Sequence, residues 1–584
     1  MRLIYLIVYF FTISIVCKAQ EKTASIFEDF KVNGARSILP DFSFAGYHYG
    51  EKEIPFLTKN VFNVSDYGIQ PNAKFDQTNK IQKIIDKVGE KGGGVIFFPK
   101  GKYLLNMDSS KVNFLKINYS HIILRGEGSG VDGTIFYNGS NTLQEEISSW
   151  LSPFLIQTGY AIQGTKSFWG IDFPNPDKIP STGVSGNNGV VNEQIKSAKI
   201  LTEIISNANK GSQTLKVKST AKLRAGDCIL IGMFNTTKDG NLMKELLAPI
   251  QEFEPQETSA LNAGQFSAPS YQWLVQIDEI INRSTVKLKQ PLRRDIKLSF
   301  HPVIAEAQML KEIGIENLRF ESAWDGNYCH HGCKNSDPKT VKLMDYGWNA
   351  VNFCRVSNGW IKNVAINNFT NAIYLLDSRN VTIDNVKITG YDGHSGVKIY
   401  GHAADNLIKN INFECNFTHV LGGEGNAYGN VFSNINYNPK RKIPGMFDSH
   451  GFSDRRFSPP AENLFEDIKG MWKISGGGSP QNLPHMAAYN TWWNVQEAGF
   501  TDQDTELFNS WFWTSKSSNH PQKDHHKMYL KSIVVGVYIP ELKLTIEGNE
   551  NDRKDEWIYV ENFNKGLVKP YSLYKAQLDL RLQK

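Results

Sequence analysis

A four-residue motif recurs along the second half of the chain: an apolar residue, a polar residue, Asn or Asp, and another apolar residue. The six copies are Ile315-Glu316-Asn317-Leu318, Ile361-Lys362-Asn363-Val364, Ile383-Asp384-Asn385-Val386, Ile408-Lys409-Asn410-Ile411, Phe432-Ser433-Asn434-Ile435 and Phe465-Glu466-Asp467-Ile468. The Asn or Asp positions are 46, 22, 25, 24 and 33 residues apart, so the first interval holds about two repeats. Alternating repeats of this length predict the stacked strand–turn coils of a parallel β-helix.

A leucine-rich solenoid is the competing repeat architecture. It would carry several leucines at fixed offsets, whereas the core positions here are Ile, Val and Phe, so the β-helix is favoured. We assign the recurrent Asn to architecture rather than to catalysis, because stacked Asn side chains hydrogen-bond along a helix axis or hold a left-handed turn. We therefore expect Asn385, Asn410 and Asn434 to lie in one column.

The region before the repeats predicts a helix that covers one end of the β-helix. Asp76 or Thr78 can cap a short amphipathic helix, and a run of three glycines at 92–94 ends it. Its apolar residues fall on one face, and they are Ile81, Ile84, Ile85 and Val88. Residues 95–103 then read as a strand, a turn and a new strand. A solenoid needs such a cap, because its open end exposes unpaired backbone groups.

The stretch from Asp66 to Tyr103 resembles the N-terminal signature of the pectate-lyase superfamily. It has the Asp66-Tyr67-Gly68 start, Thr78 in the helix, the triple glycine and a Pro-x-Gly-x-Tyr ending at Tyr103. Residues 122–128 resemble a coil common in that superfamily. With the repeats, the resemblance extends over most of residues 60–500 and implies an all-β, right-handed parallel β-helix. It says less about the reaction, since lyases, hydrolases, epimerases and phage tailspikes share this architecture.

The chain divides into four expected parts. These are a signal peptide at 1–19, an N-terminal extension at 20–60, the β-helix at 61–500 with a β-rich insertion at about 195–300, and a C-terminal segment at 501–584 that packs on the helix or caps it. Arg2, an apolar run and small residues at Cys17 and Ala19 predict cleavage before Gln20. Lipid anchoring through Cys17 is disfavoured, because Val16 is not small. No later segment resembles a membrane span, so we expect a secreted or periplasmic protein.

Composition limits the partners. The formal net charge is +5 and no long Lys or Arg block appears, which argues against nucleic acid and permits a local basic groove for an anionic substrate. We expect a monomer that binds an acidic polysaccharide. The cleaved chain would keep an odd number of cysteines, so it is not a disulfide scaffold. Cys329-His330-His331-Gly332-Cys333 lacks the paired spacing of structural zinc sites and is interpreted as a loop or a tight disulfide.

Residues 393–402 carry the main candidate site. If Val397 and Ile399 point into the core, their neighbours point outward on one exposed strip. These outward residues are His394, Lys398, Tyr400 and His402. Counting from the recurrent Asn places Glu424 level with Tyr400 and Arg455 level with Lys398. His450, Arg455 and Arg456 fall in the longer loop of the last repeat, and we expect His331 in a loop that overhangs the same face.

These residue types suit β-elimination on a uronic acid, in which the carboxylate is neutralised, the C5 proton is removed and the leaving oxygen is protonated. We predict His394 or Lys398 as the base, Tyr400 as the acid and His450 as a further catalytic residue. Arg455 and Arg456 are predicted to bind the sugar carboxylate. The remaining candidates for substrate binding are His402, Glu424 and His331.

The leading hypothesis is therefore a polysaccharide lyase acting on a uronate-containing glycan, sulfated or not, such as ulvan or a glycosaminoglycan. A glycoside hydrolase using two of the carboxylates Asp392, Glu424 and Asp448 is the alternative. The same three carboxylates are candidates for binding Ca²⁺, although the acidic pattern of the calcium-binding pectate lyases does not map cleanly onto this sequence. A β-helix that binds carbohydrate without cleaving it is the third class.

Overall fold

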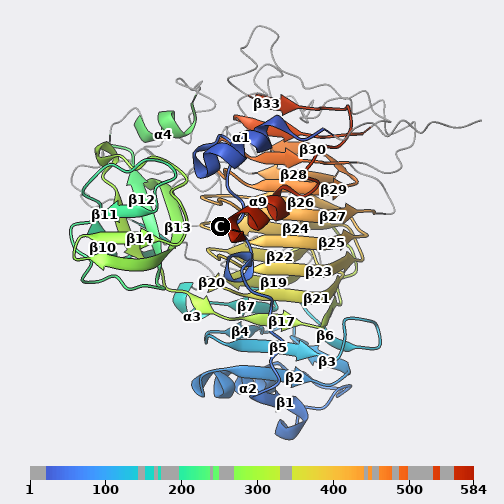
Figure 1. Ribbon diagram of the computed structural model, residues 1–584. Helices are drawn as coiled ribbons and strands as arrows, with labels where there is room; N and C mark the ends of the chain where they lie inside the picture. The colour runs from blue at the N-terminus through green and yellow to red at the C-terminus, as the bar shows by residue number, and fades with distance from the viewer. Residues whose placement is uncertain are drawn as a thin grey trace, which may run out of the picture.

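Stacked parallel coils form a right-handed β-helix that runs the length of the molecule (Figure 1), which confirms the predicted fold class. The computed structural model describes residues 22–142, 152–163, 169–171, 196–236, 241–248, 269–328, 345–439, 445–449, 459–476, 486–496, 530–539 and 558–583. The expected signal peptide lies outside these ranges. Within them, no helix is both long enough and apolar enough to cross a membrane.

The first long sheet contains the recurrent motif. Its strands, in order of pairing, are β1 (Val61–Asn63), β2 (Gly94–Phe98), β5 (Ile122–Gly126), β17 (Gly314–Glu316), β21 (Trp360–Asn367), β23 (Thr382–Thr389), β25 (Leu407–Phe413), β27 (Val431–Tyr437), β29 (Leu464–Lys469), β31 (Thr491–Trp493), β32 (Ser532–Val535) and β33 (Ile558–Glu561). Three more strands extend it beside β21, namely β3 (Gly101–Leu105), β6 (Thr134–Asn138) and β18 (Arg319–Ser322). All neighbours in this sheet run parallel, so every coil enters it in the same direction.

The recurrent asparagines form the predicted column. Each has a positive φ, with values of 55° at Asn385, 56° at Asn410 and 51° at Asn434. The Nδ2 of Asn385 donates to Asn363 at 2.8 Å, and that of Asn434 donates to Asn410 at 2.6 Å. Asn410 departs from the pattern, because its Nδ2 donates to Asp384 at 2.6 Å. Asn tolerates the left-handed conformation better than other residues with a side chain, and its amide also bonds the next coil.

Two copies of the motif escaped the sequence analysis. Asn494 follows Trp492-Trp493 and Asn562 follows Val560-Glu561, and both have the left-handed φ of the column. Gly536 occupies the equivalent corner between them with a φ of 64°, and a Cβ there would lie 2.2 Å from Asn494 Oδ1. The helix consequently continues through β32 and β33, beyond the expected boundary at residue 500. The repeat was not recognised from the sequence because Gly536 replaces the expected Asn at one corner.

The second long sheet lies on another side of the coils. Its strands are β4 (Leu115–Ile117), β7 (Ile156–Thr158), β19 (Asn349–Cys354), β22 (Asn371–Leu376), β24 (Gly393–Tyr400), β26 (Phe417–Gly423), β28 (Gly445–Ser449) and β30 (Met471–Gly476). Ile373, Val397 and Leu421 are in register on three successive strands and are fully buried. Ile399 is also fully buried, so Val397 and Ile399 point into the core as predicted.

A second asparagine column, not foreseen from the sequence, lies at the corner that leads into the first sheet. Asn406 donates to Asn430 at 2.8 Å, Asn430 to Asn463 at 2.9 Å and Asn463 to Asn490 at 3.0 Å. All four are fully buried. The short pair β16 (Leu310–Lys311) and β20 (Val356–Ser357) begins this third face, and single bridges continue it. Buried amides that satisfy one another in this way hold the coils in register.

The first and the last described helices both pack against the β-helix (Figure 1). Helix α2 (Thr78–Glu90) covers the first coils with its apolar face buried, as predicted, and Asp76 Oδ1 accepts the backbone N–H of Thr78 at 2.8 Å. Helix α1 (Ser25–Asn33) lies at the opposite end, near β33, and the chain then returns toward β1 along the flank (Figure 1). Helix α9 (Leu573–Leu582) packs beside this return, where its Gln577 accepts the N–H of Phe42 at 2.9 Å. The N-terminal extension therefore bridges several coils.

The predicted β-rich insertion is an antiparallel sheet beside the helix (Figure 1). Its strands are β10 (Ile200–Glu203), β11 (Thr214–Lys216), β12 (Cys228–Phe234), β13 (Pro269–Asn282), β14 (Thr285–Leu288) and β15 (Val303–Glu306), with α4 (Asn241–Leu246) above them. The short elements α3 (Tyr160–Gln163), β8 (Trp169–Gly170) and β9 (Lys196–Ser197) precede it. Apolar side chains from β12, β13 and β14 form its own core.

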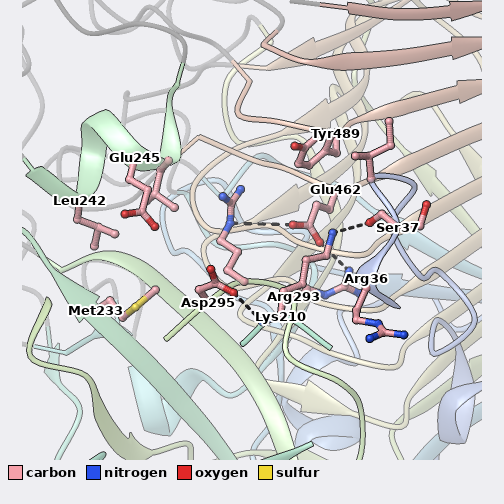
Figure 2. Close-up of a pocket in the computed structure, with 13 residues that line it drawn as sticks. Arg36, Ser37, Lys210, Met233, Leu242, Glu245, Arg293, Asp295, Glu462 and Tyr489 are labelled. Atoms are coloured by element: carbon pink, nitrogen blue, oxygen red, sulfur yellow. Dashed lines mark hydrogen bonds and ion pairs between the residues drawn. The ribbon is translucent and has the colours of Figure 1, made fainter. Parts of the chain in front are cut away.

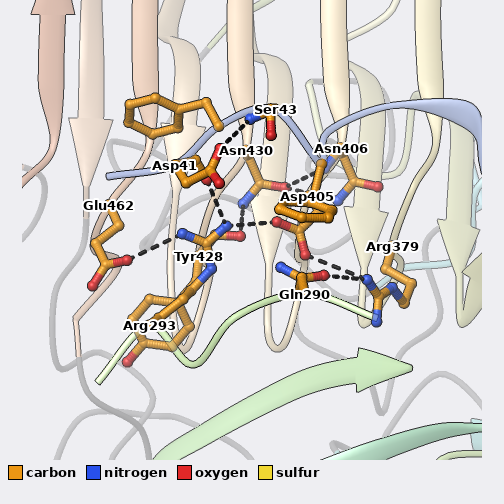
Figure 3. A network of polar contacts seen from close by, with 12 residues as sticks. Asp41, Ser43, Gln290, Arg293, Arg379, Asp405, Asn406, Tyr428, Asn430 and Glu462 are labelled. Carbon is orange, nitrogen blue, oxygen red and sulfur yellow. Dashed lines mark hydrogen bonds and ion pairs between the residues drawn. The ribbon is translucent and has the colours of Figure 1, made fainter. Parts of the chain in front are cut away.

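A buried ionic network fixes the insertion to the helix (Figure 3). Arg293 of the insertion lies 2.6 Å from Asp405 and 3.1 Å from Glu462, which lie two coils apart, on either side of the coil that contains Tyr428. Asp405 also pairs with Arg379 at 3.4 Å, and Arg379 donates to Gln290 at 2.9 Å. Buried charges need close ion-pair and hydrogen-bond partners such as these. Without them, the free-energy cost of desolvation exceeds the electrostatic attraction within the pair.

The asparagine column makes a stability prediction. Asn410→Ala forces a Cβ-bearing, amide-free residue into the left-handed corner, whereas Asn410→Gly removes the amide but keeps the backbone freedom. We expect the alanine variant to lose about 1–2 kcal/mol more unfolding free energy than the glycine variant. Urea unfolding followed by circular dichroism measures the difference. Equal stability of the two variants would show that the corner conformation carries no strain for alanine.

Candidate functional site

The outer face of the second sheet gathers several reactive side chains around Lys398. Lys398 projects outward because Val397 and Ile399, its neighbours in β24, occupy the core. Its Nζ forms an ion pair with Glu424, which follows β26 on the next coil. The same Nζ lies 4.9 Å from the ring centroid of Tyr400 and 5.7 Å from that of Tyr374 on β22. We call Tyr374, Lys398, Tyr400 and Glu424 the Lys398 cluster.

Asn371 connects this cluster to His394. Its Oδ1 accepts the hydroxyl of Tyr374 at 3.1 Å and lies 3.1 Å from Nδ1 of His394. Its Nδ2 donates to Asn349 at 2.6 Å, which fixes the amide with Oδ1 as the acceptor. In this orientation Nδ1 of His394 carries the hydrogen, so Nε2 is the basic nitrogen of the neutral ring. The ring of His394 packs edge-on against His419, with 4.7 Å between their centroids.

Tyr374 is held in its protonated form. Burial raises the pKa of its phenol above the usual value of 10, and Lys398, although its charge acts in the opposite direction, does not cancel this effect. Tyr374 therefore stays a hydrogen-bond donor at neutral pH. The ion pair between Lys398 and Glu424 likewise favours the charged forms of both side chains. The cluster thus combines a neutral phenol, an ammonium and a carboxylate.

The strip is not exposed, and this corrects the sequence analysis. His394 and Glu424 are 6% accessible and Tyr400 is 9% accessible. Beside these three, Lys398 keeps more exposure, with 17% of its side chain accessible. His402 is fully buried, and its Nδ1 bonds Asp377 at 2.8 Å. A side chain with no accessible surface does not reach a polymer in this conformation. His402 therefore holds the turn after β24 instead of lining the site.

The register of the coils confirms one predicted neighbour and corrects another. Ile399 pairs with Gly423, which places Glu424 level with Tyr400 as expected. Two coils beyond Lys398, however, the register gives Asp448 and not Arg455, because Lys398 pairs with Gly422 and Gly422 with Asp448. The remaining predicted site residues, His331, His450, Arg455 and Arg456, lie outside the described residues.

Sequence reasoning missed Tyr374, Asn371 and His419. A signal existed, because Tyr374 precedes Lys398 by one coil of 24 residues and pairs with it in register. His419 similarly pairs with Ser395, the neighbour of His394. Counting backward as well as forward from Lys398 would have placed Tyr374 beside it. Asn371 resembled an ordinary strand residue, and only its contacts identify it as the link between His394 and Tyr374.

Asp392 and Glu424, two of the three carboxylates considered for Ca²⁺, lie far apart, and each already has a partner. Asp392 accepts the backbone N–H of Asn416 at 2.9 Å and its side-chain amide at 3.1 Å to each carboxylate oxygen, while Glu424 is engaged by the ammonium of Lys398. Asn416 precedes β26 and Glu424 follows it, so this strand separates Asp392 from Glu424 by about 20 Å. Within the described ranges, no three His, Cys, Asp or Glu side chains are grouped to hold a metal ion.

Comparison with known proteins gives partial matches. Residues 61–240 match the family described as rhamnogalacturonase A/epimerase, pectate lyase-like, and residues 418–584 match a domain of unknown function, DUF4955. The SPbeta prophage-derived uncharacterized protein YomE of Bacillus subtilis (strain 168) is 37% identical over 78 residues, 13% of this chain and 12% of YomE. Alginate lyase 7 of Azotobacter vinelandii is 32% identical over 69 residues, 12% of this chain and 8% of that protein. Each match thus spans about a tenth of the relative.

Among solved structures, the tailspike protein gp49 from Pseudomonas phage LKA1 superposes with a TM-score of 0.41 and 11% sequence identity. The superposition covers 83% of this chain and 74% of the tailspike. The family match begins at β1 and includes α2, the region that carries the Asp66 to Tyr103 signature. The predicted resemblance to the pectate-lyase superfamily is therefore confirmed, with residues 61–240 as the part that matches its rhamnogalacturonase and epimerase branch.

Proposed function

We propose that this protein is a secreted polysaccharide lyase that cleaves a uronic-acid-containing polysaccharide by β-elimination at the Lys398 cluster. The observation that carries the proposal is the placement of Lys398 between two phenols, paired with Glu424 and linked through Asn371 to His394. Few structural roles require an ammonium, two phenols, a carboxylate and an imidazole on one outer face. Such concentrations of titratable groups are typical of catalytic sites.

Each step of β-elimination has a residue suited to it. The ammonium of Lys398 neutralises the sugar carboxylate, which acidifies the proton on C5. Nε2 of His394 takes that proton as the electrons move to form the C4–C5 double bond and the C4–O bond breaks. The phenol of Tyr400 then donates its proton to the leaving oxygen. Tyr374 and Asn371 position His394 and Lys398 through their hydrogen bond and ring contact.

The geometry favours elimination over hydrolysis. A hydrolase needs a protonated carboxylic acid and a second carboxylate about 5–9.5 Å away. Glu424 is paired with Lys398, which favours its ionised form, and Asp392 is about 20 Å from it along β26. The hydrolase alternative is thereby reduced to Glu424 with Asp448, whose backbone lies one coil further on, level with Gly422.

The comparisons support the substrate class. The pectate lyase-like match covers the first coils, and one local relative is named an alginate lyase, so both point to acidic polysaccharides. Lys398 provides a charge that suits a uronate carboxylate. A uronate-rich glycan, sulfated or not, such as ulvan or a glycosaminoglycan, is the substrate we propose. Secretion through the signal peptide at 1–19 would bring the enzyme to such a polymer.

The reaction type is tested by digesting a panel of acidic glycans while recording ultraviolet absorbance and reducing ends. Elimination creates an unsaturated uronate, so we expect both signals to rise together on at least one uronate polymer. Reducing ends without absorbance would identify a hydrolase using Glu424 and Asp448. Retention of the polymer with neither signal would identify a binding protein.

Replacing Lys398 separates chemistry from folding. Lys398→Met should lower kcat/KM on the cleaved glycan by about 10²–10³-fold, as the loss of one charge-stabilising group does elsewhere. It should also lower the unfolding free energy by about 1–3 kcal/mol, because the carboxylate of Glu424 loses its cation. The double variant Lys398→Met with Glu424→Gln removes both charges, so we expect stability to return and activity to stay low. Recovery of activity in the double variant would exclude Lys398 from the reaction.

The two phenols make a matched pair of variants. Tyr400→Phe removes the proposed acid and should lower kcat by about 10²–10⁴-fold. Tyr374→Phe removes the hydroxyl that donates to Asn371, so a loss of about tenfold is expected, corresponding to one neutral hydrogen bond. Steady-state kinetics on the same polymer measures both. If Tyr374→Phe were the more damaging change, the roles of the two phenols would be reversed.

A further inference from the structure

A pocket of about 290 Å³ lies where the insertion, the N-terminal extension and the β-helix meet (Figure 2). Glu462 and Tyr489 line it from the helix side, while Met233 and Leu242 of the insertion form the facing wall. No member of the Lys398 cluster is among its described lining residues. The chemistry of this pocket therefore needs its own explanation.

Four basic side chains line the pocket. They are Arg36, Lys210, Arg293 and Arg294. Arg293 is compensated by Asp405 and Glu462, as described for the buried network. Arg294 lies farther from its nearest carboxylate, because its Nε is 4.0 Å from Oε1 of Glu462. Nε and Nη2 of Arg294 are both buried, and neither finds a hydrogen-bond acceptor in the described part of the chain. A buried guanidinium without acceptors is costly unless a ligand supplies them.

The carboxylates around the pocket are already engaged. Glu245 pairs with Lys297 at 2.8 Å, and Asp295 accepts the backbone N–H of Lys210 at 2.8 Å. The ammonium of Lys210 donates to the backbone carbonyl oxygen of Ser37 at 2.7 Å. Because that oxygen is neutral, this contact does not cancel the charge of the ammonium. Burial lowers the pKa of Lys210; the charge of Glu462 acts against this effect, and those of Arg294 and Arg293 add to it. Among the lining residues, the four cations outnumber the three carboxylates Glu245, Asp295 and Glu462.

We propose that this pocket is a second binding site, which takes the carboxylate or sulfate group of an acidic sugar residue on the guanidinium of Arg294. A planar guanidinium binds such oxyanions through two parallel hydrogen bonds, which would satisfy Nε and Nη2 together. The identification of the ligand as a sugar rests on the proposed function. The presence of an anion-binding site at Arg294 does not depend on it.

The walls suit a sugar residue. Tyr489 lies beside the ammonium of Lys210, with 5.6 Å from Nζ to the ring centroid, and offers an aromatic face next to the cations. Met233 and Leu242 give the facing wall an apolar surface for the carbon side of a pyranose ring. The volume is at the lower end of the range for ligand pockets, about 300–1,000 Å³, and so matches one or two sugar residues rather than a polymer segment. The site would hold a chain end or a released product.

Isothermal titration of the full chain with sodium glucuronate, glucose and sodium sulfate tests the proposal. We expect glucuronate to bind and glucose not to bind. Arg294→Met should weaken glucuronate binding by about 10–100-fold, the loss that follows from removing a charge-assisted hydrogen bond. Lys218→Met, an exposed cation of the insertion paired with Glu203, is the matched control and should change nothing. The double variant Lys398→Met with Glu424→Gln should keep the binding, which separates this pocket from the Lys398 cluster.

Other outcomes contradict the proposal. Unchanged glucuronate affinity in Arg294→Met would place the binding elsewhere, and sulfate binding without glucuronate binding would leave an inorganic anion site only. Absence of binding by all three compounds would leave no ligand site. If Arg294→Met fails to fold, Arg36→Met at the exposed rim decides, with an expected weakening of about threefold or more, and no change there would count against the site. Glucuronate binding without any cleavage in the glycan assay would leave this site standing while removing the lyase.

Discussion

The left-handed corner at the recurrent asparagine is the constraint on which the rest of the structure depends. A single coil cannot bury its own apolar residues, so each must stack on the next in fixed register. Asn385, Asn410 and Asn434 achieve this by adopting a positive φ and bonding across coils through their amides. Where Gly536 replaces Asn, the backbone conformation is kept although the amide is lost. Register repeated in this way carries outward side chains of successive coils to within about 5 Å of one another.

The Lys398 cluster is a consequence of that register. Tyr374 and Lys398 are 24 residues apart in the chain yet adjacent on the sheet, and Glu424 joins them from a third coil. The same stacking brings Asp405 and Glu462 together, where Arg293 of the insertion binds both. In both places charges are withdrawn from water and must find partners. At one place the pairing fixes the insertion; at the other it holds an ammonium beside two phenols.

Sequence periodicity predicted the coils because the corner demands one residue type that is easy to see. It failed where the corner was filled by Gly536 and where Asn494 followed two tryptophans, since neither matched the expected pattern. Alternation also placed Val397 inside and Lys398 outside correctly. The sequence could not predict solvent accessibility. Alternation shows on which side of a strand a residue lies, but it does not show what covers that side. His402, for example, lies in a turn where it is fully buried and its Nδ1 bonds Asp377.

The sequence by itself determined the parallel β-helix, the helix at its N-terminal end and the inward or outward direction of residues in β24, because these follow from local periodicity. Beyond the asparagine column and the position of Glu424 beside Tyr400, only the tertiary structure decided which residues meet across coils. The tautomer of His394 depends on Asn371, which lies 23 residues earlier, and the pocket that contains Arg294 is built from three distant parts of the chain. Loop lengths between coils vary, so counting along the sequence loses the register within two coils, as with Arg455. Backbone hydrogen bonding between neighbouring strands restores it.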